Sequence, residues 1–287
     1  MKVYILNAFA KTKRGGNPAG VVLDADGMAE TFMQKTAAKI GLSETAFVQK
    51  SVAADFKTRF FTPSIEVDLC GHATIAVFSL LFGLQRIKAG RLSQETRAGI
   101  LGVEVQNDGT VFMEQTLPSF EGEIDRGEVA GSLGIGPGSL APDLPVQIVS
   151  TGLRDIIVPV HSLRDLLSMK PDMHKIADIS KKQRGVGYHA FSLETMHRST
   201  AHCRNFAPLY GIPEEAATGT SSGALACYLF KYGKIPAERA QRIVFEQGYG
   251  MRRPSEIFVR LVIENANIIG VHVGGKATTA KEKTLSV

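Results

Sequence analysis

Cysteine and long apolar runs are scarce in this chain, and each shortage excludes a class of protein. The 287 residues include three cysteines, at positions 70, 203 and 227, with no CxxC pair, so neither a disulfide framework nor a cysteine-rich metal site is predicted. The best apolar run, residues 75–84, is too short to cross a membrane. The first residues have the pattern of a strand and not of a signal peptide. We therefore expect no membrane partner and a cytoplasmic location.

Motifs for nucleotides and metals are also missing. Neither GxGxxG after a strand nor GxxxxGK[ST] occurs, and the seven histidines show no HExxH spacing. We expect no cofactor and no metal. The net charge is +5 and the basic residues are scattered, without the concentrated basic face of a nucleic-acid-binding protein. A mildly basic surface instead suits a small acidic ligand, and the chemistry must come from side chains.

The composition is that of an ordinary globular protein, with 44% hydrophobic and 21% charged residues. The predicted strands are Val3–Ala8, Gly20–Leu23, Thr45–Val48, Asp55–Phe61, Val103–Val105, Thr110–Glu114, Val146–Val149, Ile156–Pro159, Gly187–Leu193, Thr200–Phe206, Arg242–Glu246, Glu256–Leu261 and Ile268–Val273. The predicted helices are Met28–Ile40, Ala73–Phe82, Leu163–Met169 and Ser221–Tyr232, with a short turn near Ala237. A Gly- and Pro-rich stretch separates two sets of elements. We expect an N-terminal domain over residues 1–118, a linker zone over 119–145 and a C-terminal domain over 146–287, whose last strand can return to the first domain.

An internal repeat relates the two halves. Arg59-Phe-Phe-Thr-Pro63 and Arg204-Asn-Phe-Ala-Pro208 share the pattern Arg-x-Phe-x-Pro. Each is followed by a glycine bend, at Gly71 or Gly219, and then by an apolar run that ends at another glycine. Ordered matches of this kind favour duplication of one structural unit.

The two apolar runs after the bends predict how each unit is built. Ala73–Phe82 and Ala224–Phe230 are apolar nearly all round, so each helix should be enclosed by protein. A twisted sheet around a central helix meets that requirement. We therefore predict an α+β fold of two pseudo-symmetric domains, each a barrel-like, mainly antiparallel sheet around a central helix. Two such domains side by side would direct both helix N-termini toward one cleft.

The glycine bends are candidate anion-binding sites. A helix N-terminus offers unpaired backbone N–H groups and the positive end of the helix dipole, both of which attract a carboxylate. Gly71 in the first half, and Gly219, Thr220 and Ser221 in the second, are small enough to let a ligand reach those donors. The alternative is that Gly71, Thr74, Thr218 and Thr220 only turn and cap the two helices. The presence of the same device in both halves favours the binding role.

Glu44 is the candidate acid/base. It lies in a Leu-Ser-Glu-Thr-Ala-Phe segment at a predicted helix-to-strand junction, where apolar neighbours would raise the pKa of a buried carboxyl toward the range that proton transfer needs. The alternative is a surface glutamate at the start of a strand. Ala46-Phe47 corresponds to Ala190-Phe191, which puts the counterpart of Glu44 near Tyr188, a residue that is not an acid. Only one half would then supply this proton-transfer group.

Three further residues near the bends are candidates with weaker support. His72 follows the first bend and has the right chemistry to donate to a carboxylate or share a proton, although a histidine beside a turn is often structural. Glu215, just before the second bend, is a candidate for positioning substrate or pairing with His72, although acidic pairs are usually solvated. Cys70 would be a nucleophile if the helix dipole activated it, or otherwise a small buried hydrophobe.

The same motifs carry a resemblance to a known family. They are Gly16-Asn-Pro-Ala-Gly-Val-Val22, Leu42-Ser-Glu-Thr-Ala-Phe-Val48, Asp68-Leu-Cys-Gly-His-Ala-Thr74 and Glu214-Glu-Ala-Ala-Thr-Gly-Thr220. Together they resemble the PhzF-like isomerases of phenazine biosynthesis, which share their fold with diaminopimelate epimerase. The resemblance spans nearly the whole chain.

The resemblance implies a cofactor-independent homodimer with an active site between the two domains of each chain. It implies that Glu44 moves a proton, as the matching glutamate does when the phenazine enzyme isomerises dihydro-hydroxyanthranilate, and that His72 and Gly71 belong to the same site. The second motif departs from the family's usual Glu-Asp-Pro-x-Thr-Gly-Ser, because Glu215, Ala216 and Thr220 stand at the Asp, Pro and final Ser positions. The longer acid at Glu215 puts the phenazine substrate itself in question.

Fold relatives that racemise amino acids resemble each other in using two cysteines, one before each bend. Cys70 matches the first position, but Thr218 stands at the second. A hydroxyl cannot replace a thiolate as an α-proton base at neutral pH. Two-thiol racemisation is therefore disfavoured.

The sequence thus predicts an isomerase or epimerase that acts on a small carboxylated metabolite. Glu44, His72 and Glu215 would carry the chemistry, and Gly71, Gly219, Thr220 and Ser221 would bind the substrate. Two alternatives stay open, namely a one-cysteine epimerase that uses Cys70 and a small-acid-binding protein without catalysis.

Overall fold

The computed structural model describes residues 1–285, which form two compact units. Unit 1 is Met1–Glu114 together with the segment that starts at Gly274, and unit 2 is Gln115–Val273. Within the described residues, none of the helices combines the length and the apolarity needed to span a membrane.

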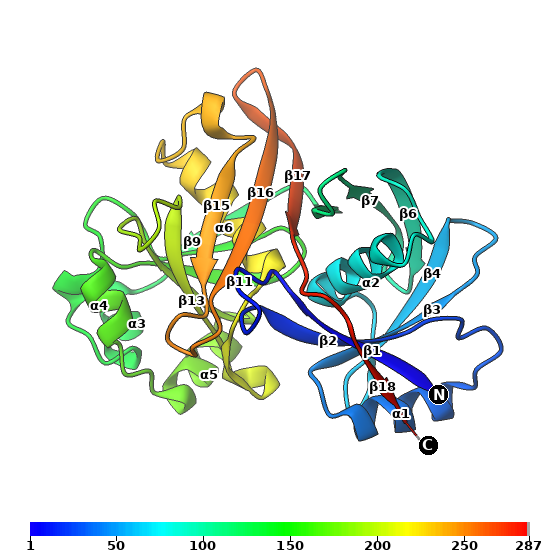
Figure 1. Cartoon of the computed structure of the whole chain (residues 1–287). Helices are drawn as coiled ribbons and strands as arrows, with labels where there is room; N and C mark the ends of the chain where they lie inside the picture. The colour runs from blue at the N-terminus through cyan, green and yellow to red at the C-terminus, as the bar shows by residue number, and fades with distance from the viewer. Residues whose placement is uncertain (286–287) are drawn as a thin grey trace. The chain divides into compact units, whose positions relative to one another are not determined.

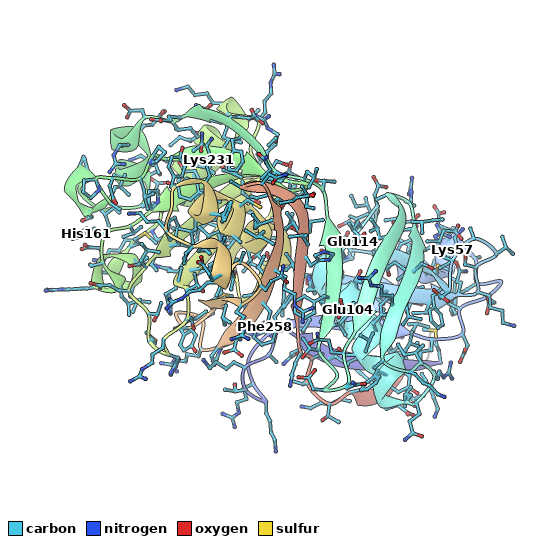
Figure 2. All side chains as sticks on the ribbon, turned by 90° about the horizontal axis from the view of Figure 1, so that it is seen from above. Lys57, Glu104, Glu114, His161, Lys231 and Phe258 are labelled. Carbon is cyan, nitrogen blue, oxygen red and sulfur yellow. The ribbon has the colours of Figure 1, made fainter. Side chains whose placement is uncertain are left out.

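Unit 1 is a curved sheet packed around one buried helix. Its elements are β1 (Lys2–Ala8), β2 (Asn17–Val22), α1 (Glu30–Ile40), β3 (Glu44–Gln49), β4 (Phe56–Phe61), β5 (Glu66–Val67), α2 (Gly71–Gly83), β6 (Gly90–Thr96), β7 (Gly99–Val105), β8 (Val111–Gln115) and β18 (Lys281–Thr284). The ladder runs β18-β1-β2-β3-β4-β6-β7-β8, parallel at β2/β3 and β4/β6 and antiparallel elsewhere. Helix α2 contacts β1, β2, β3 and β7 (Figure 1), so it is enclosed from several sides as its apolar sequence predicts. On the outside of this unit lie charged side chains such as Lys57 and Glu104 (Figure 2).

Unit 2 repeats this plan and adds helices outside its sheet. Its elements are β9 (Ser119–Glu123), α3 (Arg126–Ser132), the 3-10 turn η1 (Pro137–Ser139), β10 (Gln147–Ser150), β11 (Arg154–Pro159), α4 (Leu163–Ser168), α5 (Met173–Lys182), β12 (Gly187–Ser192), β13 (Ala201–Ala207), η2 (Pro208–Tyr210), β14 (Ile212–Glu215), α6 (Gly219–Lys231), η3 (Ala237–Arg239), β15 (Ile243–Gln247), β16 (Ser255–Glu264) and β17 (Asn267–Gly275). Helix α6 contacts β10, β11 and β16, whereas α3, α4 and α5 pack outside the sheet over a core that includes Ile156, Tyr188 and Phe206.

Two arginines fix the register between the repeats. Arg59 and Arg204 each lie over the ring of the phenylalanine two residues further on. Each also forms a two-bonded ion pair with a glutamate of the next short strand, Glu66 on β5 or Glu214 on β14. These shared contacts make the two arginines equivalent and confirm that the Arg-x-Phe-x-Pro match is structural.

This register corrects one predicted correspondence. Arg59 is paired across the ladder with Phe47, and Arg204 is paired with Ala190. Phe47 is therefore equivalent to Ala190, and Glu44, three residues earlier, is equivalent to Gly187 and not to Tyr188. A one-residue slip turns every side chain to the other face of a sheet, which is why the sequence match of Ala-Phe pairs was misleading.

Several elements were not predicted from the sequence. They are β5, β6, β9, β14, β18, α3 and α5. Most are short or polar, and β6 (Gly90–Thr96) has hardly any apolar residues to show its alternation. Residues 119–145, predicted as a linker zone, contain β9, α3 and η1 and belong to unit 2, because the glycines and prolines there serve turns between short elements.

Candidate active site

Glu44 is placed by the end of α1. The helix stops at Gly41, which adopts φ 69°, a left-handed conformation that favours glycine. Three residues later Glu44 opens β3, and its side chain is 18% exposed. The surface alternative for this residue is thereby excluded.

His72 brings the polar groups of unit 1 together. It is the second residue of α2, its side chain is 7% exposed, and its Nε2 lies 3.1 Å from Oε2 of Glu44. The Sγ of Cys70 is 3.4 Å from Nδ1, and the Oγ of Ser43 is 3.4 Å from Nε2. The amide nitrogen of Asn17 is 3.5 Å from Nδ1. Glu44 and His72, predicted separately, thus form one acid–base pair.

Asn17 was not among the predicted site residues, although it lies in one of the four motifs that carry the family resemblance. The preceding Gly16 has φ +82°, and a Cβ there would lie 2.5 Å from the carbonyl oxygen of Ala8. Only glycine fits this turn, and the turn delivers Asn17 to the ring of His72. A glycine before a polar residue was the available signal in the sequence.

The pair is polarised as an ion pair. Burial raises the pKa of Glu44, but hydrogen bonds and charge from His72, with further hydrogen bonds from Ser43 and Cys70, hold it below its ordinary value. Burial lowers the pKa of His72, but hydrogen bonds to Cys70 and Glu44, together with the charge of the Glu44 carboxylate, more than offset this and place the pKa well above 6.5. At neutral pH Glu44 is therefore a carboxylate beside a protonated His72.

Cys70 is a thiol in this environment. Its residue is 8% exposed, and burial, followed by the charge of Glu44, raises the pKa of Cys70 above its usual value. The pull of the protonated His72 and of the backbone at the start of α2 is too weak to reverse this. A thiol with a raised pKa is a poor base at neutral pH, which argues against a mechanism that depends on Cys70.

The same three side chains contain a possible set of metal ligands. One donor atom each from Glu44, Cys70 and His72 lies within 4.8 Å of the other two. Among the described residues, this is the one group of three or more such side chains that could hold a metal ion. A thiolate, an imidazole and a carboxylate suit a zinc-like ion. Binding would require loss of the protons on Cys70 and His72, so the ion and the acid–base pair compete for the same atoms.

Glu215 belongs to a second polar cluster, at the start of α6. Its Oε2 accepts a hydrogen bond of 2.7 Å from the hydroxyl of Thr218. Gln247 on β15 accepts from the backbone N–H of Thr218 and donates to the backbone oxygen of Glu215, at 3.2 and 2.8 Å. Glu214 instead holds Arg204 and takes a structural role.

A buried acid in unit 2 was missed by sequence reasoning. Asp155 on β11 is 2% exposed, and its Oδ1 accepts a hydrogen bond of 2.9 Å from the hydroxyl of Ser221 in the first turn of α6. In the sequence it follows an arginine in a strand, which resembles an ordinary surface ion pair. The hydroxyl of Ser221, predicted to bind substrate, is thus already engaged. Gly219 and Thr220, predicted to form the bend before a helix that starts at Ser221, are instead the first two residues of α6.

The structure therefore gathers the predicted residues into two clusters. Glu44, His72 and Gly71 lie together in unit 1, and Glu215, Gly219, Thr220 and Ser221 lie together in unit 2. The expectation that both clusters act on one ligand stays a prediction.

The fold is shared with enzymes that racemise or epimerise amino acids. A hydroxyproline epimerase from Agrobacterium vitis, crystallised with trans-4-hydroxy-L-proline, matches with a TM-score of 0.64 at 12% identity, over 99% of this chain and 90% of that one. A PhzF-family phenazine biosynthesis protein from Bacillus anthracis matches much more closely, with a TM-score of 0.89 at 32% identity, over 100% of this chain and 99% of that one. The protein is thus a mixed α/β, mainly-strand member of the diaminopimelate epimerase-like fold.

Sequence comparison gives the family directly. Residues 6–283 match the phenazine biosynthesis-like protein family, PhzC-PhzF. The isomerase YfhB of Bacillus subtilis is 35% identical over 100% of this chain and 99% of its own length. The trans-2,3-dihydro-3-hydroxyanthranilate isomerase of Pseudomonas aeruginosa is 29% identical over 98% of both chains. The chain belongs to the PhzF family and is an isomerase, which sets aside the alternative of a binding protein without catalysis.

Proposed function

We propose that the protein catalyses cofactor-independent proton transfer on a small carboxylated metabolite, with Glu44 as the general acid/base. One observation carries the proposal: the Glu44 carboxylate is mostly buried beside His72. The Oε2 of Glu44 is buried and lies 3.1 Å from Nε2 of His72. An ionised carboxylate that is sheltered from water is suited to accept a proton from substrate carbon.

In this proposal the proton returns to the substrate. The Glu44 carboxylate takes a proton from one carbon and becomes a carboxylic acid, and the electron pair left behind delocalises toward the substrate's carboxylate. Glu44 then delivers the proton to another carbon in isomerisation, or to the other face in epimerisation. The protonated His72 stabilises the negative charge. The backbone at Gly71, and at Gly219, Thr220 and Ser221, is proposed to hold the acid group, with Glu215 tuning its protonation.

The test is solvent-deuterium exchange in a panel of compounds. Small aromatic acids, amino acids and trans-2,3-dihydro-3-hydroxyanthranilate, the substrate named for the Pseudomonas relative, are incubated with the protein in deuterated water and read by mass spectrometry. Enzyme-dependent incorporation into a carboxylated compound is expected. Calorimetric binding without exchange, for every compound that binds, would contradict proton transfer.

His72→Asn is expected to shift the acid limb of the pH–activity profile upward. His72 is the largest influence that lowers the pKa of Glu44, so its removal raises that pKa and Glu44 is protonated at a higher pH. The measurement is the initial exchange rate between pH 4 and 9. An acid limb at the same pH in both proteins would remove His72 from the proposed role, and Asn preserves a polar side chain for comparison.

Cys70→Ala is expected to retain exchange within about tenfold of wild type, because a thiol of raised pKa is not the base. This variant tests the one-cysteine alternative, which the closeness of Sγ to His72 keeps in consideration. Loss of exchange comparable to that of a Glu44 variant would favour the cysteine mechanism. Cys227→Ala, a buried thiol in the middle of α6, is the matched control.

Activity is expected to survive a chelator, and zinc ions are expected to inhibit. A divalent ion held by Glu44, Cys70 and His72 would occupy the lone pair that accepts the proton. Exchange rates are compared in EDTA and in micromolar zinc. Abolition by EDTA with recovery on adding metal would show that the chemistry is not cofactor-independent.

Homodimer assembly, which the family resemblance implies, is also part of the proposal. Size-exclusion chromatography with light scattering tests it, with a mass of twice 30.9 kDa as the expected result.

A further inference from the structure

The strongest unexplained feature outside the Glu44–His72 pair is a buried carboxyl without a counter-charge. Asp155 is 2% exposed, and its Oδ2 is buried with no hydrogen-bond partner in the described residues. A buried carboxyl normally has a cationic or hydrogen-bonded partner for both oxygens. An asparagine or serine would anchor Ser221 at lower cost, so anchoring alone does not account for an aspartate here.

The pairing of strands shows where this acid lies in the repeat. In unit 1 the parallel strands β2 and β3 place Ala19 beside Glu44. In unit 2 the equivalent parallel strands β11 and β12 place Asp155 beside Gly187. Glu44 is equivalent to Gly187 on β12, so the acid of unit 2 is not at the position equivalent to Glu44. Asp155 is instead on the neighbouring strand β11, at the position equivalent to Ala19 on β2. Both acids approach the first turn of their central helix, through His72 on α2 and Ser221 on α6.

Close packing explains why the acid of unit 2 is not on β12. A Cβ at Gly187 would lie 2.1 Å from the carbonyl oxygen of Phe206 on β13. No side chain fits at that position unless the two strands separate. The neighbouring strand β11 is then the one that can bring a carboxyl to the start of α6.

Most charged and titratable groups on the elements packed around Asp155 are engaged with other residues, and Glu215 is the group that acts on its carboxyl by charge. On β11, Arg154 turns to Glu121 and to the backbone oxygens of Gln183 and Arg184. On β12, Tyr188 accepts from Ser132 and His189 pairs with Asn205. On α6, Tyr228 donates to the backbone oxygen of Pro145, Lys231 lies over Phe120 and Cys227 stays a thiol with its pKa raised by burial. β10 carries no charged residue.

The remaining partner is on β14, where Glu214 is held by Arg204 and Glu215 faces the start of α6. Burial raises the pKa of Asp155 to about 7. The hydrogen bond from Ser221 opposes this rise, and the charge of Glu215 adds to it. The charge of Glu215 therefore helps to keep the proton on Asp155.

We propose that Asp155 is a positioning residue of unit 2, which fixes the first turn of α6 through Ser221 and sets by its own charge how strongly that turn binds the substrate's carboxylate. Below neutrality Asp155 is protonated, and the turn carries the charge of Glu215 alone. Above neutrality both carboxyls are ionised and repel an anionic substrate. The effect on binding rests on the proposed function, whereas the protonation of Asp155 does not.

The first experiment measures that protonation without any substrate. The full chain is labelled with aspartate carrying 13C at the side-chain carboxyl, and its signals are followed by NMR from pH 3 to 9. One signal is expected to titrate near pH 7 and to be absent in Asp155→Asn. Glu215→Gln removes a like charge and should lower that midpoint, and Ser221→Ala removes a hydrogen bond that favours the charged form and should raise it. No signal titrating above pH 5, or a midpoint that neither variant moves, would overturn the proposal.

The second experiment measures the pH dependence of KM with a carboxylated compound that shows deuterium exchange. In wild type KM is expected to rise roughly five- to tenfold between pH 6 and pH 8.5, as one added unit charge near a bound anion would cause. In Asp155→Asn the rise should be lost while kcat near pH 6 is retained. An unchanged KM profile in that variant, with the NMR midpoint in place, would restrict Asp155 to anchoring and overturn the binding role. Absence of exchange with every compound would instead contradict the proposed function.

Discussion

Glu44→Gln is expected to reduce deuterium exchange into the substrate by roughly 10²–10⁴-fold, the usual contribution of a general acid/base. The amide has nearly the same shape as the carboxylate but cannot accept a proton from carbon. Substrate affinity should change little, because the acid group is proposed to be held by backbone N–H groups and not by Glu44. The measurements are exchange rate by mass spectrometry and Kd by calorimetry, on the same preparation.

A surface glutamate supplies the control for this substitution. Glu264 is exposed at the end of β16, and Glu264→Gln should leave both exchange and Kd at wild-type values. Near-wild-type exchange in the Glu44 variant would remove Glu44 from the mechanism, whatever its position. A large loss of binding with exchange at saturation preserved would instead make Glu44 a binding residue.

Asp155→Asn is expected to change the pH dependence of stability by roughly 4 kcal/mol. The folded pKa of Asp155 is raised to about 7 from an ordinary 3.8, so the folded state retains a proton that the unfolded state releases. For a raised carboxyl pKa, stability falls as pH rises from the ordinary value to the folded value, and then stays at the lower level. Relative to the variant, wild type should lose this amount of stability between about pH 4 and pH 7.

The measurement is the free energy of unfolding in urea at pH 4 and pH 8, for wild type and variant. The difference in free energy of unfolding between wild type and variant is then compared at the two pH values. Any fixed cost of burying the new amide is the same at both and cancels. In Asp178→Asn, a substitution on the exposed side of α5, this difference should be the same at both pH values. If the difference for Asp155→Asn is also the same at both pH values, folding does not raise the pKa of Asp155.

The sequence predicted the central features of the fold because they depend on strong local patterns. The two helices that are apolar on every side could only be enclosed, and their identity as α2 and α6 is confirmed. The Arg-x-Phe-x-Pro repeat predicted equivalent strands, and the shared contacts of Arg59 and Arg204 confirm that equivalence. Family membership was predicted from four motifs, and the match of residues 6–283 to the family confirms it.

What failed depended on partners far away in the sequence. The counterpart of Glu44 was displaced by one residue, since register is fixed by cross-strand pairing and not by matching letters. Asp155 was missed because its significance comes from burial and from Ser221, more than sixty positions later. The short strands β5 and β14 form by pairing with β4 and β13, so no local sequence pattern predicts them.

The return of β18 to pair with β1 has a consequence for how this protein is made and dissected. Unit 1 is discontinuous, because its sheet includes residues from both ends of the chain, with all of unit 2 between them. During synthesis, residues 115–273 are complete and free to fold before the last strand of unit 1 leaves the ribosome. The half that carries Glu44 and His72 is thus the later one to finish. Expressing unit 1 separately would require joining position 114 to position 274 through a short linker. A chain that stops after β8 lacks β18 and leaves the backbone hydrogen-bonding groups at that edge of β1 unpaired.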